Sequence, residues 1–138
     1  MEMKYIMIDI NQIIEPIADD EIWRVPVIGG VEFDRYLVST YGRVLSLNYK
    51  GRGEIKLLKL SINNNGYYKV TLWHNGMKYP MMVHRLVAIT YSDLVVNDDP
   101  SKKVCVAHKD KNHFNNHVSN LYWTEYDPYR ELRKKRVE

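Results

Sequence analysis

The segment 104–138 constrains the fold most strongly, because two short apolar stretches there flank a long polar loop. VCVAH (104–108) and LYWTE (121–125) have the length and the β-branched or aromatic content of strands. The loop between them, KDKNHFNNHVSN, is rich in histidine and asparagine. Asp127 and Pro128 then suit the N-cap and first position of a helix. The segment therefore predicts strand, loop, strand and helix in that order.

The preceding part of the chain predicts short strands. Residues 21–62 alternate apolar runs with turn residues, and we expect strands in YLVST (36–40), RVLSL (43–47) and EIKLLKLSI (54–62). NNNG at 63–66 is a turn signal, because asparagine and glycine tolerate a positive φ.

A hairpin and a helix are predicted next. YYKVTLWH (67–74) alternates apolar and polar residues and runs into Asn75-Gly76, the commonest two-residue hairpin turn. MKYPMMV would be the returning strand, and VHRLVAITYSDLV (83–95) has helical period. The whole pattern indicates an α+β fold.

Composition and charge exclude several classes of protein. A chain of 138 residues has the length of one domain, and its net charge of +3 is too small to identify a nucleic-acid partner. The single cysteine, Cys105, excludes an internal disulfide and is typical of a reducing cytoplasm. The N-terminal apolar stretch is broken by Asp9 and Pro16 and lacks the features of a signal peptide, and no run approaches a membrane span. We therefore expect a soluble cytoplasmic protein.

AHKDKNHFNNHVSNLYW (107–123) resembles the active-site segment of HNH endonucleases, in the branch found in phage and intron-encoded homing nucleases. The family pattern is approximately N/D/H-H-x-D-G-N-x-x-N-N-x-x-x-N-L-x-W. VHRLVAITY (83–91) is similar to the helix that these proteins place upstream, and EIWRVPVIGGVEFDRYLVSTYGRVLSL (21–47) is similar to the small domain that often precedes the core. The three matches occur in the family's order.

The resemblance implies a domain organisation. A β-rich N-terminal small domain would precede a ββα-metal core, also called a His-Me finger, within an α+β fold. The expected boundaries are an N-terminal arm at 1–20, a nuclease-associated β domain at 21–62, and an HNH domain at 63–138 that includes the upstream hairpin and helix.

The resemblance also implies catalytic residues for phosphodiester hydrolysis. His108 takes the position of the general base, and a neutral imidazole with a pKa near ~6.5 suits that task. Asn120 matches the asparagine whose amide ties the loop together and helps to orient the base. Asp110 matches the loop acid, which usually caps the turn by hydrogen bonding to backbone amides.

The implied metal ligands are altered. The family ligand that precedes the base is Ala107 here, and the ligand on the following helix falls at Tyr129. Neither a methyl group nor a neutral phenol suits Mg²⁺, which prefers carboxylate and amide oxygens. Asp127 becomes the candidate ligand if the alignment shifts slightly, and Glu125 and Glu131 are further candidates. Active protein would need Mg²⁺ or another divalent metal, and inactive protein would need none. Lys111 replaces the family's loop glycine, so that the turn is reshaped or the lysine is strained.

Several of these residues have other interpretations. Cys105, His108, His113 and His117 have spacing similar to a zinc knuckle, but strand alternation directs Cys105 and His108 to opposite faces, which argues against it. His84, at the start of a helix, is expected to cap or pack. The tryptophans are expected to be core aromatics: Trp23, Trp73 and Trp123.

Basic residues on both sides of the core favour double-stranded DNA as a partner, mainly through its phosphates. The C-terminal set is Arg130, Arg133, Lys134 and Arg136, and the upstream set is Arg43, Lys50, Arg52, Lys56 and Lys59. Such runs also occur as solvated surfaces that bind nothing.

Two functions remain open. The first is a small HNH endonuclease that nicks DNA. Its specificity would be weak, because we expect this chain to lack the DNA-reading modules that follow the core in related nucleases. The second is a catalytically silent HNH-fold module that binds DNA or a host protein, for example as a phage inhibitor. Intact His108, Asp110 and Asn120 favour cleavage, whereas Ala107 and Tyr129 favour silence. Either protein would act in the cytoplasm of a phage-infected bacterium, away from membranes.

Overall fold

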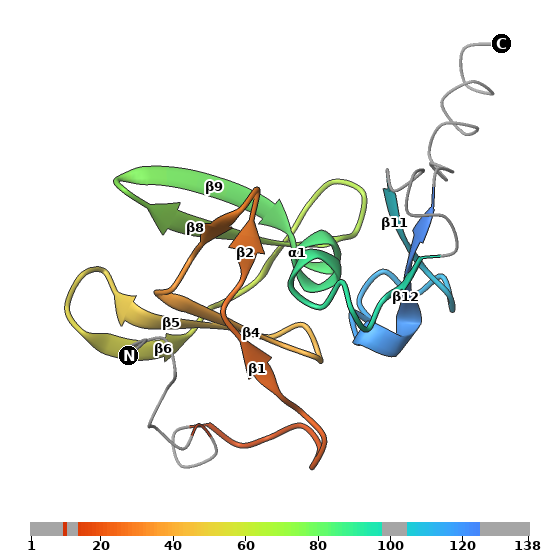
Figure 1. Ribbon diagram of the computed structural model, residues 1–138, viewed down its shortest axis with the longest axis horizontal. Helices are drawn as coiled ribbons and strands as arrows, with labels where there is room; N and C mark the ends of the chain where they lie inside the picture. The colour runs from red at the N-terminus through yellow and green to blue at the C-terminus, as the bar shows by residue number, and fades with distance from the viewer. Residues whose placement is uncertain (1–9, 11–13, 98–104, 125–138) are drawn as a thin grey trace, which may run out of the picture.

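A computed structural model describes residue 10, residues 14–97 and residues 105–124 of the chain (Figure 1). Most of the predicted N-terminal arm, most of the loop at 97–103 and the predicted C-terminal helix lie outside the described residues. The described part is mostly β-strand with a single α-helix, as expected of an α+β fold. In that part no helix is long and apolar enough to cross a membrane.

The first sheet is antiparallel with the order β1-β4-β5-β6. Its strands are β1 (Trp23–Arg24), β4 (Tyr36–Ser39), β5 (Val44–Tyr49) and β6 (Glu54–Leu57), and a separate hairpin joins β2 (Val27–Ile28) to β3 (Val31–Glu32). Every residue of β4 is buried, as is the first half of β5. The strands predicted at 36–40 and 43–47 are therefore confirmed.

The second sheet consists of β7 (Ser61–Ile62), β8 (Tyr68–His74) and β9 (Met77–Met82). The turn between β8 and β9 has positive φ at both central residues, 51° at Asn75 and 76° at Gly76. Positive φ at both positions defines the hairpin turn whose twist matches that of the flanking strands. The predicted hairpin and its turn are confirmed.

The prediction of one strand over 54–62 is wrong. The segment divides into β6 and β7, which belong to different sheets. Between them Leu58 and Leu60 pack against the core, and the amide of Leu58 donates to the carbonyl of Val44 at 2.8 Å. Burying these two leucines turns the chain from the first sheet to the second.

Helix α1 (Val83–Thr90) lies at the centre of the molecule (Figure 1). It contacts β2, β4, β8 and β9, and also β11 (Cys105–His108) and β12 (Leu121–Thr124). Its buried positions include Val83, Leu86 and Val87, which share one helical face. The helix ends five residues earlier than its apolar period predicts. Tyr91 leaves the helical conformation at φ −116°, and its buried hydroxyl donates to the carbonyl of Val38 at 2.6 Å.

The third sheet has the order β10-β12-β11, from β10 (Val96–Asn97), β12 (Leu121–Thr124) and β11 (Cys105–His108). β11 and β12 are antiparallel, with His108 opposite Leu121. They confirm the two strands predicted around the polar loop. Residues of all three sheets and of α1 form one hydrophobic core.

The predicted core position of Trp73 is wrong. Trp123 is buried and Trp23 is half-buried, but Trp73 is 55% exposed. Val70 and Leu72 of the same strand face the core, so strand alternation directs Trp73 outward.

Candidate active site

His108 lies at the end of β11, where the polar loop begins. Burial alternates along this strand, so that Val106 and His108 face inward while Cys105 and Ala107 are more exposed. The side chain of His108 is 7% exposed. The strand thus holds the imidazole at the edge of the core, with little access to bulk water.

A hydrogen bond fixes the tautomer of this imidazole. Nε2 of His108 lies 2.7 Å from Oδ1 of Asn116. An amide oxygen only accepts hydrogen bonds, so Nε2 carries the hydrogen and the lone pair of the neutral ring is on Nδ1. Nδ1 is therefore the atom of His108 that can accept a proton.

Three aromatic rings surround His108. The ring centroids of His84, His113 and Tyr67 lie 5.1 Å, 5.5 Å and 5.8 Å from that of His108. Tyr67 is buried and stacks on both of the other histidines, at 4.7 Å from His84 and 4.1 Å from His113. The turn before β8, the start of α1 and the polar loop thus converge on the base position.

This environment keeps His108 neutral. Burial lowers its pKa below the usual value, and the nearby His113 lowers it further. The hydrogen bond to Asn116 and the carboxylate of Asp110 act in the opposite direction. The net shift is downward, so the ring is unprotonated and able to act as a base at neutral pH.

Asp110 and Asn120 close the loop that follows His108. Oδ1 of Asp110 accepts hydrogen bonds from the amide of Asn112 at 2.8 Å and from Nδ2 of Asn120 at 2.9 Å, and Oδ2 accepts from Nδ2 of Asn115. Oδ1 of Asn120 accepts from the amide of Asp110 at 3.1 Å. The loop contacts expected of these residues are present, but the ring of His108 is bonded to Asn116 rather than to Asn120.

Lys111 adopts a left-handed conformation, with φ 63°. This is the position where the resemblance calls for glycine, and a lysine there is strained. We expect Lys111→Gly to raise the free energy of unfolding by about 1 kcal/mol, because the relief of strain exceeds the entropic cost of glycine. Urea denaturation would measure it. Lys109→Gly, which removes the same charge from a residue without positive φ, should instead destabilise the protein; equal effects would contradict the assignment of strain.

The turn after β4 packs directly on the loop that carries Asn116. The amide of Val118 donates to the carbonyl of Thr40 at 3.0 Å, and the ring of Tyr41 meets that of His117 edge-on at 4.4 Å. Gly42 has φ 86°, and a Cβ built on it would lie 2.8 Å from Cβ of Asn116. The turn after β4 therefore supports Asn116, the residue that holds His108.

The chain is similar to known proteins in sequence and in structure. A model of the NUMOD4 motif matches residues 21–73. HNH endonuclease L245 of Acanthamoeba polyphaga mimivirus is 40% identical over 94 residues, 68% of this chain and 25% of that protein. DNA endonuclease I-HmuI of Bacillus phage SP01 is 35% identical over 88 residues, 64% of this chain and 45% of that protein. The fold also matches a solved structure of the HNH homing endonuclease I-HmuI, which concerns DNA binding and cleavage by that enzyme. The TM-score is 0.60 and the sequence identity 33%, over 84% of this chain and 59% of that chain.

The chain belongs to the HNH homing endonuclease family. It spans less than half the length of these curated relatives.

Ala107 and Tyr129 stand where the resemblance places the HNH metal ligands. Ala107 precedes His108 on β11 and offers no donor atom to a cation. Among the residues that the structure describes, no group of three or more histidine, cysteine or acidic side chains could hold a metal ion. The other candidate, Asp127, and the residue at the family's second position, Tyr129, lie outside the described residues. The described residues alone do not make an HNH metal site.

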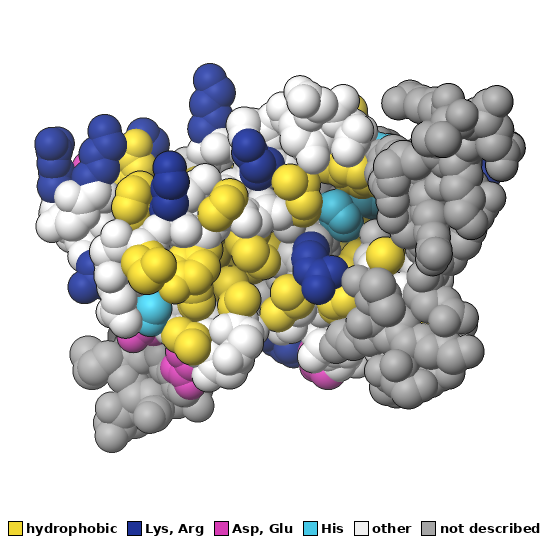
Figure 2. Space-filling view, turned by 90° about the horizontal axis from the view of Figure 1, so that it is seen from above, with side chains coloured by type: hydrophobic (Ala, Val, Ile, Leu, Met, Phe, Trp, Pro, Cys, Tyr) yellow, Lys and Arg dark blue, Asp and Glu magenta, His cyan; other side chains and the backbone are white. Residues whose placement is uncertain are grey.

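The basic residues proposed to contact DNA have different surroundings. Arg43 donates through Nε to Oε2 of Glu21 at 2.9 Å and lies over the ring of Trp23, so its charge is already neutralised within the chain. Lys56 is exposed, with Nζ 4.3 Å from the ring centroid of Tyr49. Figure 2 shows lysine and arginine side chains gathered at the end of the molecule formed by the β5–β6 and β8–β9 hairpins. Their contacts with DNA stay a prediction, as do those of Arg130, Arg133, Lys134 and Arg136, which lie outside the described residues.

Sequence reasoning missed Asn116, Tyr67 and the contact of His84 with the site. Asn116 is one of several asparagines in the loop, and only the fold selects the one that faces His108. The expected packing role of His84 is confirmed, and its partners are the rings of His108 and Tyr67. Tyr67 follows a turn in the sequence and gives no sign of facing an active site.

His84 makes folding sensitive to acid. Burial lowers its pKa to about 3, and its Nδ1 is buried without a hydrogen-bond partner. Below pH 6.5 the unfolded chain binds a proton at His84 that the folded chain refuses until about pH 3. The contribution of His84 to the free energy of unfolding is therefore fully present above pH 6.5 and is lost as the pH falls from 6.5 to about 3, by up to about 5 kcal/mol. Urea denaturation at several pH values would measure the slope, and His84→Phe, which keeps a ring on Tyr67, should flatten it. An unchanged slope would contradict the assignment.

Proposed function

We propose that this protein binds double-stranded DNA and nicks it by hydrolysis, with Nδ1 of His108 as the general base. The observation that supports this most directly is the 2.7 Å contact between Nε2 of His108 and Oδ1 of Asn116. It directs the lone pair to Nδ1 of a ring that burial keeps neutral. Kinship with HNH endonucleases supports DNA as the substrate class.

The proposed reaction is a displacement at phosphorus. Nδ1 takes a proton from a water molecule, whose oxygen bonds to the phosphorus while the bond to the leaving sugar oxygen breaks. The leaving oxygen takes a proton from solvent, and the imidazolium returns its proton to solvent. Asn116 holds the ring throughout, and the hydrogen bonds of Asp110 and Asn120 hold the loop. A divalent cation such as Mg²⁺ would neutralise phosphate charge when bound, with Asp127 as its candidate ligand.

Incubation of supercoiled plasmid with the protein tests the proposal. We expect nicked circles in the presence of Mg²⁺ or Mn²⁺ and none with EDTA. The His108→Ala variant, purified identically, identifies any contaminating nuclease. Equal nicking by both proteins, or none by wild type with either metal, would refute the proposed activity.

Ala107 specifically favours a second function, a catalytically silent module that binds DNA or a host protein. If wild type retards DNA in a gel without nicking it, Ala107→Asp combined with Tyr129→Asn should restore metal-dependent nicking. Nicking restored in this way would support the second function, in which the wild-type protein keeps the HNH fold but does not cleave DNA. DNA binding would be weakened by added salt, as expected for contacts with phosphates.

A further inference from the structure

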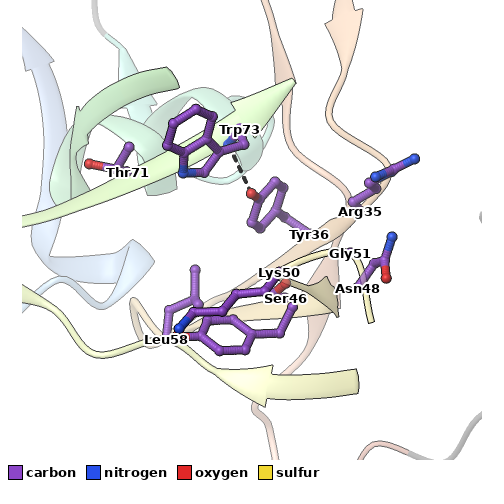
Figure 3. A pocket seen from close by; sticks show the side chains of 10 residues that line it. Arg35, Tyr36, Ser46, Asn48, Lys50, Gly51, Leu58, Thr71 and Trp73 are labelled. Atoms are coloured by element: carbon purple, nitrogen blue, oxygen red, sulfur yellow. Dashed lines mark hydrogen bonds between the residues drawn. The ribbon is translucent and has the colours of Figure 1, made fainter. Parts of the chain in front are cut away.

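A hollow lies between the first sheet and β8, and His108 is not part of its lining. Its volume is about 520 Å³, which is within the usual range for small-molecule sites. Its lining includes Trp73, Tyr36, Lys50 and Arg35 and contains no carboxylate. Figure 3 shows Trp73 on one side and Lys50 with Leu58 on the other, with Tyr36 between them.

Hydrogen bonds hold both sides of this hollow in place. The backbone amide of Trp73 donates to the hydroxyl of Tyr36 at 2.8 Å, which ties β8 to β4. On the other side Oδ1 of Asn48 accepts from the amide of Gly53, closing the turn that carries Lys50. Nζ of Lys50 lies 5.4 Å from the ring centroid of Tyr49. The hollow is therefore formed before any ligand arrives.

The chemistry of the lining suits a nucleotide. Trp73 is 55% exposed, so its large indole ring is accessible to a planar ligand that stacks on it. Exposed aromatic rings beside cations form stacking platforms for unpaired bases, because every base presents a π-face. Arg35 and Lys50 are both exposed and carry the charge that a phosphate requires. A purely apolar ligand would leave these two cations unused.

We propose that this hollow binds one unpaired nucleotide of a DNA strand, with its base on Trp73 and its phosphate near Arg35 and Lys50. A base within a duplex could not enter, so the nucleotide would come from a single strand or from a locally opened duplex. This rests on the proposed function only in taking DNA as the ligand. Binding requires neither metal nor cleavage, so the two proposals can fail separately.

Tryptophan fluorescence and the anisotropy of a labelled oligonucleotide, both with EDTA present, test the proposal. Thymidine monophosphate and a short oligothymidylate should quench wild-type emission, and Trp73→Phe should abolish the quenching while retaining most of the binding. Trp73→Ala should weaken oligothymidylate binding about fivefold to a hundredfold. Lys50→Gln should weaken binding of the monophosphate but leave that of thymidine unchanged.

Ile62→Ala provides the matched control, because Ile62 is 58% exposed on the neighbouring strand β7 and does not line the hollow. It should bind oligothymidylate as wild type does. Wild-type affinity in Trp73→Ala, or quenching that persists in Trp73→Phe, would overturn the nucleotide site. If wild type fails to nick plasmid but its Trp73 signal responds to oligothymidylate, the site stands and the nuclease proposal falls.

Discussion

The His108→Ala variant is expected to nick plasmid about 10²- to 10⁴-fold more slowly than wild type, because it lacks the proposed general base, which would remove the proton from water. The imidazole is 7% exposed, so its removal also leaves a small cavity. Initial rates of nicking measured at pH 7.5 would give the ratio. His108→Gln is the control for the cavity. It fills the space with a side chain that is not a base, and it should be equally slow.

The same base predicts the pH dependence of nicking. The rate should rise with pH as His108 loses its proton, and burial lowers its pKa, so this rise should occur below pH 6.5. Asn116→Asp keeps an oxygen beside Nε2 but adds a negative charge that stabilises the imidazolium. The rise should then move about 1 to 3 pH units higher.

A rise at the same pH in wild type and Asn116→Asp would contradict the assignment of His108 as the titrating base. Asn115→Asp is the matched control. It adds the same charge to the same loop at a residue whose amide bonds to Asp110 rather than to the ring. It should shift the profile much less than Asn116→Asp.

Much of the fold follows from local rules in the sequence. The Asn75-Gly76 turn requires positive φ at both residues, and few other residue pairs meet this demand so easily. The helical face formed by Val83, Leu86 and Val87 follows from spacing alone. The break between β6 and β7 could not be predicted in this way, because a continuous apolar run fits one long strand as well as two short ones.

The sequence predicted the residues of the site only where they belong to the HNH motif. The position of His108 and the loop contacts of Asp110 and Asn120 follow from the resemblance to HNH proteins. The contact with Asn116 depends on the path of the loop in space. The exposure of Trp73 was missed because large aromatic residues are usually buried, and alternation along β8 outweighs this tendency here.

The Gly42→Ala variant is expected to be destabilised by about 2–5 kcal/mol. Gly42 has φ 86°, and its added Cβ would lie 2.8 Å from Cβ of Asn116 and 3.6 Å from Cγ1 of Val83. A left-handed alanine costs roughly 1–2 kcal/mol, and an overpacked contact costs roughly 1–3 kcal/mol more. Urea denaturation would measure the loss. Gly76→Ala is the control, because Gly76 has φ 76° but open space around its added Cβ, so it carries only the backbone cost.

A clash at this position should also change catalysis. In the Gly42→Ala variant, Asn116 can avoid the new Cβ only if its side chain or its loop shifts. Oδ1 of that side chain accepts the hydrogen bond from Nε2 of His108, so a shift would disturb the imidazole. The variant should therefore nick more slowly even under conditions in which it is fully folded, whereas Gly76→Ala should nick at the wild-type rate. Full activity of folded Gly42→Ala would show that the turn after β4 supports stability alone.

The double variant Gly42→Ala/Asn116→Gly separates the clash from the backbone strain. Asn116→Gly removes the atom that the new Cβ would strike, so the two changes together should cost less stability than the sum of their separate costs. A coupling energy of about 1 kcal/mol or more is expected for residues in such close contact. The double variant should remain slow, because it lacks the amide that orients His108. Strictly additive costs would show that the Cβ added at Gly42 does not strike Asn116, and would contradict the proposed route from the turn after β4 to His108.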